Sequence, residues 1–466
     1  MAAVSETEDK KGGSASLLER MLTLKRTDPG EFWFRCLFWT FWVHLLFYSI
    51  GYGFREVMPP LCAIFLCLYY RYNWKNSVLA RLPVWPLFFC LWIMLLIGIV
   101  FSIDPKGSLL EVGTALNKGL LLPFLGMECV RSLKDLKRLT IAAALAVFWV
   151  GLDGIYQSVN GIDLIMGYPP NAGRLTSVMD DYEIGNYLAL SFVPAFGFWY
   201  IAKDKMLPHN ALLLCVLFFF PGVFTLMGSA VRSAMLALTV SAAAWVVCFR
   251  SKKSWKYLIG IAVFVGAALF LLQNFQVNRF NYEDVSQDGR WSLWSLGWSI
   301  FLAHPVFGAG IDMYNTAFRM LGLIPACDVI TISHPHNMYL DILCSTGVVG
   351  AVFGYTFLFG TLFWLARHIV PRLAESWQPP VQGESEKPGA CKLYWQLAGL
   401  FALAWLTWLA NAVFGHELLR MWWFGHAMLS FGVSIGAIVR GLEGEKESRA
   451  AAQGAAQEKA GQKKTE

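Results

Sequence analysis

Long apolar runs separated by short clusters of charged residues dominate the chain. A helix needs about 20 mostly apolar residues to cross the roughly 30 Å hydrocarbon core of a bilayer. Such runs predict twelve spanning helices, over residues 33–53, 57–72, 84–103, 108–128, 138–159, 182–202, 211–228, 231–249, 256–273, 346–366, 393–413 and 420–439. The second run is short and the fourth carries Glu111 and Lys118. The pattern predicts an all-α integral membrane protein with about twelve transmembrane helices.

Composition excludes an ordinary soluble protein. Hydrophobic residues make up 56% of the chain and charged residues 15%, with a mean hydropathy of +0.48, whereas soluble domains carry about 25% charged residues. The net charge of +6 does not indicate nucleic-acid binding, because the Lys and Arg residues lie in short clusters between apolar runs. We therefore expect a lipid bilayer as partner and no nucleic acid.

The distribution of basic residues predicts the orientation, since cytoplasmic loops are enriched in Lys and Arg. With the N-terminus inside, 28 of the 38 Lys and Arg residues fall in inner segments. Seven fall outside: Arg55, Lys106, Arg174, Arg279, Arg290, Arg319 and Arg420. An even number of spans returns the C-terminus to the cytoplasm.

The segments outside the spans differ in length and composition. We expect a cytoplasmic N-terminal tail, nine spans, a large outer loop with an amphipathic helix, three more spans and a disordered cytoplasmic tail, over residues 1–31, 32–273, 274–345, 346–440 and 441–466. A shorter outer loop covers 160–181. Within the large loop, one predicted helix face collects Trp291, Trp294, Trp298 and Phe301, and the neighbouring face Ser292, Ser295 and Ser299. This pattern predicts a helix that lies on the membrane or caps the bundle.

Three outer arginines are candidate ligands for an anion. Arg232 lies at a brief polar break between two apolar runs, where an arginine is costly unless it is paired, snorkels to the boundary or faces water. Arg174 and Arg290 lie in the two long outer loops and have nearby acidic residues with which to pair. A cluster of arginines can also hold a diphosphate, because guanidinium groups bind phosphate oxygens through two parallel hydrogen bonds.

Two histidines end the large outer loop. His334 and His336 stand in Ser-His-Pro-His-Asn, directly before an apolar run. A histidine here can act as a general base at neutral pH. The sequence offers no Cys, Asp or Glu at ligand spacing, so we expect no metal site. Cys327 and Cys344 are close enough in sequence to pair, although small buried hydrophobes are the default interpretation of the cysteines.

The same region resembles a known family. His336-Asn337, nine residues, and then Gly347-Val-Val-Gly350 is similar to the motif of bacterial O-antigen ligases and their relatives. Upstream, Gly289-Arg290 and the turn from His304 to Gly310 resemble the periplasmic loop of that family.

Two further arginines extend the resemblance. Arg174, with Gly185-Asn186 downstream, and Arg232 fall where family members carry functional arginines. The resemblance covers about residues 170–360 by motif and the whole chain by topology.

The resemblance implies a GT-C-type glycosyltransferase in the inner membrane of a Gram-negative cell, with its active site on the periplasmic side. It would transfer O-antigen polysaccharide from undecaprenyl diphosphate to a sugar hydroxyl of the lipid A core, with inversion and without metal or cofactor. His336 would be the general base, and the three arginines would bind the donor diphosphate. His334, Asn337, Tyr339 and Asn186 would support them.

Other functions remain open at this point. An O-antigen polymerase or a protein O-oligosaccharyltransferase would use the same donor and the same kind of bundle. A membrane transporter would also explain twelve spans, but it predicts polar residues along several spans, and the span interiors here are nearly free of charge. Neither the sugars nor the oligomeric state can be deduced from the sequence.

Overall fold

The computed structural model describes residues 17–179, 183–248, 255–256, 259, 290–323, 334–375, 388–415 and 418–465. Over these residues the chain is helical, and its one β-bridge joins Asn171 to Arg174. The α-helices are α1 (Leu17–Thr27), α2 (Pro29–Leu46), α3 (Tyr52–Asn73), α4 (Trp85–Val100), α5 (Pro105–Ala115), α6 (Leu122–Glu128), α7 (Leu133–Asn160), α8 (Ile184–Ala195), α9 (Gly197–Lys203), α10 (Pro208–Gly228), α11 (Arg232–Cys248), α14 (Arg290–Ala303), α15 (Tyr314–Met320), α16 (Met338–Glu375), α17 (Pro388–Asn411) and α18 (Met421–Thr465).

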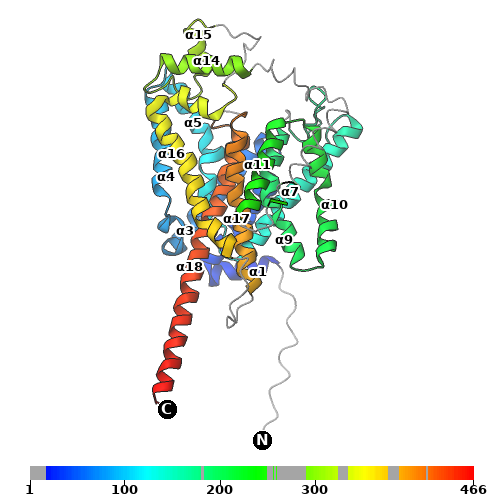
Figure 1. Ribbon diagram of the computed structural model, residues 1–466, viewed down its shortest axis with the longest axis vertical. Coiled ribbons are helices and arrows are strands. Elements are labelled where there is room, and N and C mark those ends of the chain that lie inside the picture. Colours follow the sequence, from blue (N-terminus) through cyan, green and yellow to red (C-terminus); the bar gives the residue numbers. More distant parts are fainter. Residues whose placement is uncertain are drawn as a thin grey trace.

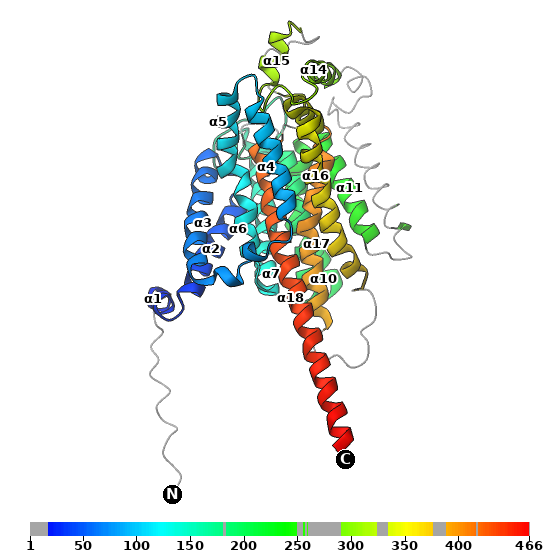
Figure 2. The ribbon, with the colours of Figure 1, turned by 90° about the vertical axis from the view of Figure 1, so that its left-hand side faces the viewer.

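The long helices stand side by side in one bundle (Figure 1). Helices α14 and α15 lie across one end, which we call the α14 end, while α1 and the C-terminal part of α18 lie at the opposite, α1 end (Figures 1 and 2). The apolar stretches of α8, α17 and α18 are mostly buried in the interior, whereas α10 exposes a row of large apolar side chains. An exposed apolar surface of this kind suits contact with lipid.

Six described helices are long and apolar enough to cross a membrane: Leu133–Asn160, Ile184–Lys203, Pro208–Gly228, Met338–Ala374, Cys391–Asn411 and Trp423–Ser448. Two shorter apolar helices are Trp85–Val100 and Arg232–Cys248. These helices confirm an all-α membrane protein. The predicted span at 256–273 lies outside the described residues apart from Lys256 and Ile259, so the count of twelve stays a prediction.

Two predicted segments differ from the structure. The span expected over 108–128 is not one continuous α-helix, because a π-helical turn at Leu116–Leu120 separates α5 from α6. The tail expected to be disordered after residue 440 continues α18 as a helix to Thr465. Its Ala, Gln, Glu and Lys residues are strong helix formers, so low hydrophobicity was a poor indicator of disorder here.

A helix, α14, occupies the place where the large loop was predicted to form one, but most of its aromatic face does not pack on the protein. Leu293, Leu296 and Ile300 are buried, while Trp291 and Trp298 are 65% and 50% exposed. The hydroxyl of Tyr314 donates to the carbonyl of Leu293 at 2.8 Å. Helix α14 therefore caps the bundle through its aliphatic side and presents Trp291 and Trp298 outward.

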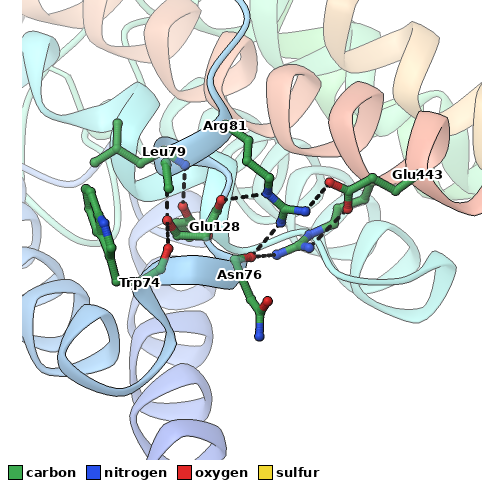
Figure 3. A network of polar contacts seen from close by, with 9 residues as sticks. Trp74, Asn76, Leu79, Arg81, Glu128 and Glu443 are labelled. Carbon is green, nitrogen blue, oxygen red and sulfur yellow. Dashed lines mark hydrogen bonds and ion pairs between the residues drawn. The ribbon is translucent and has the colours of Figure 1, made fainter.

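A network of polar contacts fastens the α1 end (Figure 3). Glu128, at the end of α6, accepts hydrogen bonds from the Leu79 backbone at 2.9 Å and the Tyr70 hydroxyl at 3.1 Å. Arg81 and Arg440 both pair with Glu443 on α18. The connection between α3 and α4 is thereby joined to α6 and α18, far from the α14 end.

Candidate active site

The two histidines predicted at the end of the large loop lie in one tight turn before α16. His334 is 6% exposed and His336 is half-buried. Their ring centroids are 4.4 Å apart with the rings inclined by 61°. His336 has a φ of +52°, a left-handed conformation that is costly for a residue with a side chain and is often found at functional sites. We call residues 334–337 the histidine turn.

Asn337 and Tyr339 hold this turn in place. The Asn337 side-chain oxygen accepts hydrogen bonds from the backbone of Tyr339 and Leu340 at 3.0 and 3.1 Å, which caps the start of α16. The Met338 backbone donates to the carbonyl of Ala412 at 3.0 Å, and the Tyr339 hydroxyl donates to the carbonyl of Leu409 at 2.8 Å. The histidine turn is therefore fixed against the end of α17.

The environment of His334 keeps its ring neutral. Burial, and to a smaller extent the positive charge of Arg420, lower the pKa of His334 from 6.5 to about 4. At pH 7 the ring is therefore uncharged, and its contact with His336 places a neutral imidazole beside the proposed base.

Glycines allow α16 to pack closely against the turn that follows α14. The helical geometry of α16 is interrupted by a kink at Gly347, which has a φ of +61°. Around this kink the backbone of Ala309 donates to Cys344 at 2.8 Å, and that of Val348 donates to Pro305 at 2.9 Å. A Cβ on Gly308 would lie 2.3 Å from the backbone nitrogen of Thr346. The glycines of the family-like motif thus allow two backbones to approach closely near the histidine turn.

Arg232 and Arg174 lie in neighbouring turns at the α14 end. Arg232 begins α11, directly after a turn in which Ala230 has a φ of +52°. Arg174 lies in a tight turn closed by two backbone hydrogen bonds of 3.0 Å with Asn171. The Leu175 backbone then donates to the carbonyl of Gly228 at 3.0 Å. This bond joins the Arg174 turn to the segment that leads into α11.

Asn186, near the start of α8, links α11 to α17. It is 4% exposed, and its side-chain oxygen accepts a hydrogen bond from the Asn411 amide at 2.9 Å. The Ser233 hydroxyl lies 3.5 Å from the same oxygen. Asn186 therefore positions the residue next to Arg232 against the end of α17, the same end that holds the histidine turn.

Arg290 is the first residue of α14. One turn further along α14, Trp294 stacks on Phe414 with ring centroids 6.2 Å apart. The structure thus brings His334 and His336 into contact. Arg174, Arg232 and Arg290 lie at the same end of the bundle, each on a separate element.

Arg420 and Glu183 belong to this region and were not predicted as site residues. The Arg420 guanidinium pairs with the Glu183 carboxylate at 3.0 Å, with side chains 39% and 4% exposed. Glu183 directly precedes α8 and Arg420 directly precedes α18. The sequence offered one signal, a lone arginine in a short outer turn, but no means of identifying its partner.

Within the described part of the chain, no group of three or more His, Cys, Asp or Glu side chains is arranged to hold a metal ion. Cys344 is a free thiol that donates to the carbonyl of Gly297 at 3.0 Å, while Cys327 lies outside the described residues.

Comparison with known proteins identifies a family that matches part of this region. Residues 214–354 match the O-antigen ligase family. The match includes Arg232, Arg290 and the histidine turn, whereas Arg174 and Asn186 precede it. No curated protein matches the chain. The resemblance seen in the motifs is confirmed over residues 214–354, where the chain matches the O-antigen ligase family model.

Proposed function

We propose that this protein is an O-antigen ligase that transfers O-antigen polysaccharide from undecaprenyl diphosphate to a sugar hydroxyl of the lipid A core. The observation that carries the proposal is the histidine turn, held at the α14 end beside the arginine-bearing starts of α11 and α14, inside the matched domain. We place this end at the periplasmic face of the inner membrane, in a GT-C-type bundle with both termini in the cytoplasm.

The proposed reaction uses His336 as general base. Its imidazole takes the proton from the acceptor hydroxyl while the acceptor oxygen bonds to the anomeric carbon of the donor sugar. The bond from that carbon to the phosphate oxygen breaks, and the electron pair leaves with the diphosphate. A positioned base of this kind contributes about 10²–10⁴-fold to rate.

Arg174, Arg232 and Arg290 would bind the diphosphate. Negative charge on the leaving group grows as the glycosidic bond breaks, and fixed guanidinium groups stabilise it without reorganising. Attack from the face opposite the diphosphate inverts the anomeric centre. The donor already stores the free energy of transfer, so this chemistry requires neither nucleotide nor metal.

Replacement of His336 by Ala tests this proposal in cells that depend on the protein for lipopolysaccharide. We expect gels to show lipid A core without attached polysaccharide, together with accumulated lipid-linked polymer. His304→Ala is the matched control, because His304 lies at the same end of the bundle but outside the histidine turn.

The same gels separate the alternatives. A polymerase predicts core bearing a single repeat unit. A protein O-oligosaccharyltransferase predicts unchanged lipopolysaccharide and loss of glycosylated protein, and a transporter predicts no loss specific to His336→Ala. An unchanged polysaccharide ladder would remove His336 as the base.

A further inference from the structure

Arg420 occupies a connection that is joined directly to the histidine turn. The α17–α18 connection accepts the Met338 hydrogen bond at Ala412, and the Leu418 backbone contacts the Asp341 carboxylate at 3.4 Å. Trp294 of α14 stacks on Phe414 in the same connection. The segment that ends at Arg420 therefore contacts the elements bearing His336 and Arg290.

Glu183 places the Arg420 guanidinium on the side toward Arg232. Glu183 is nearly fully buried and stands three residues before Asn186, whose side-chain oxygen lies 3.5 Å from the hydroxyl of Ser233. The guanidinium is thus held between the start of α8 and the histidine turn. Its charge reaches His334, whose pKa it helps to lower.

A purely structural ion pair accounts poorly for this arrangement. A partly exposed ion pair contributes little to stability, and a buried carboxylate loses much of its hydration energy. A guanidinium, however, has five N–H donors in a rigid plane. The Arg420 guanidinium can donate to the Glu183 carboxylate from one edge and to phosphate oxygens from another.

We propose that Arg420 is a further donor-binding residue, which contacts a phosphate oxygen of the lipid-linked diphosphate while Glu183 fixes its orientation. The inference rests on the function proposed above. It adds a fourth arginine to the three identified from the sequence.

The test measures binding of undecaprenyl diphosphate to purified full-length protein in nanodiscs. We expect Arg420→Gln to weaken binding by about ten- to a hundredfold, the usual effect of losing a hydrogen bond to a charged group. Arg420→Lys keeps the charge but loses the planar fork, so it should fall between wild type and Arg420→Gln. Glu183→Gln should weaken binding less, because Arg420 is retained without its anchor.

Arg319→Gln is the matched control, since Arg319 is an exposed arginine on α15 at the same end. It should bind as wild type does. Unfolding temperatures of all variants are measured in parallel. If Arg420→Gln lowers the unfolding temperature but binds undecaprenyl diphosphate with wild-type affinity, Arg420 is structural and the inference is overturned. If the wild-type protein does not bind undecaprenyl diphosphate, the proposed function and this inference fall together.

Discussion

At the scale of single residues, the buried His334 couples folding to pH. In the folded protein its pKa is about 4, whereas the ordinary value is 6.5. Between these values the unfolded chain binds a proton that the folded protein does not, so stability falls as the pH falls from 6.5 towards 4. Above pH 6.5 the His334 ring is neutral in both states and the free energy of unfolding keeps its full value. Below pH 4 the protonation of His334 lowers the free energy of unfolding by about 3 kcal/mol.

His334→Gln should remove this pH dependence while keeping a neutral polar side chain. We expect the unfolding temperature of wild-type protein in detergent to drop by several degrees more than that of His334→Gln between pH 7 and pH 4.5. His304→Gln controls for the loss of a half-buried histidine at the same end. Parallel pH profiles for wild type and His334→Gln would show that His334 becomes charged without penalty.

The residues of the candidate site were predictable where their signal is local. The His334-Pro-His336-Asn337 run and the isolated outer arginines stand out against apolar neighbours. The Arg420–Glu183 pair joins residues 237 positions apart, and no local spacing indicates such a contact. The left-handed backbone of His336 was equally hidden, because it depends on hydrogen bonds from α16 to the end of α17.

At the scale of elements, the kink of α16 and the turn after α14 form one interlocked unit. A Cβ on Gly347 would lie 2.4 Å from the backbone carbon of Val306, and Gly347 also has a left-handed φ of +61°. Backbone cannot move aside as a flexible side chain can. We expect Gly347→Ala to combine a conformational cost of about 1–2 kcal/mol with an overpacking cost of about 1–3 kcal/mol.

Gly322→Ala separates these two costs. Gly322 has a similar φ of +63°, but nothing lies within 4 Å of its added Cβ. We therefore expect Gly322→Ala to show the conformational cost alone, and Gly347→Ala to unfold at a clearly lower temperature or to fail to accumulate in membranes. Equal unfolding temperatures would mean that the kink of α16 yields to a methyl group.

The helices themselves were predictable to different degrees. Apolar runs with few charges, such as those of α7, α10 and α17, became long helices because burial and lipid contact both favour them. The run at 108–128 broke at Leu116–Leu120, where it also carries Lys118. Helix α14 was predicted as a helix, but hydrophobicity did not reveal which face packs, since the aliphatic side fits α16 while Trp291 and Trp298 remain exposed.

At the scale of the whole molecule, the two ends of the bundle have different chemistry. The α14 end gathers the histidine turn with Arg174, Arg232, Arg290 and Arg420. The α1 end carries the polar network around Glu128, and α18 projects beyond it (Figures 2 and 3). Cytoplasmic segments attract Lys and Arg, so the basic clusters favour the α1 end as the inner side. Arginines at the α14 end therefore require an explanation other than topology, and donor binding supplies one.

Labelling with a membrane-impermeant maleimide tests this orientation. Met320 on α15 is 69% exposed, and Gln453 on α18 is also exposed. We expect Met320→Cys to gain label over the parent protein in cells with a permeabilised outer membrane, and Gln453→Cys to gain it only after lysis. The parent measures labelling of the ten native cysteines. The reverse pattern would place the histidine turn in the cytoplasm. The proposed transfer to the lipid A core takes place in the periplasm, so the histidine turn would then have no acceptor. The proposed function would fail together with the orientation.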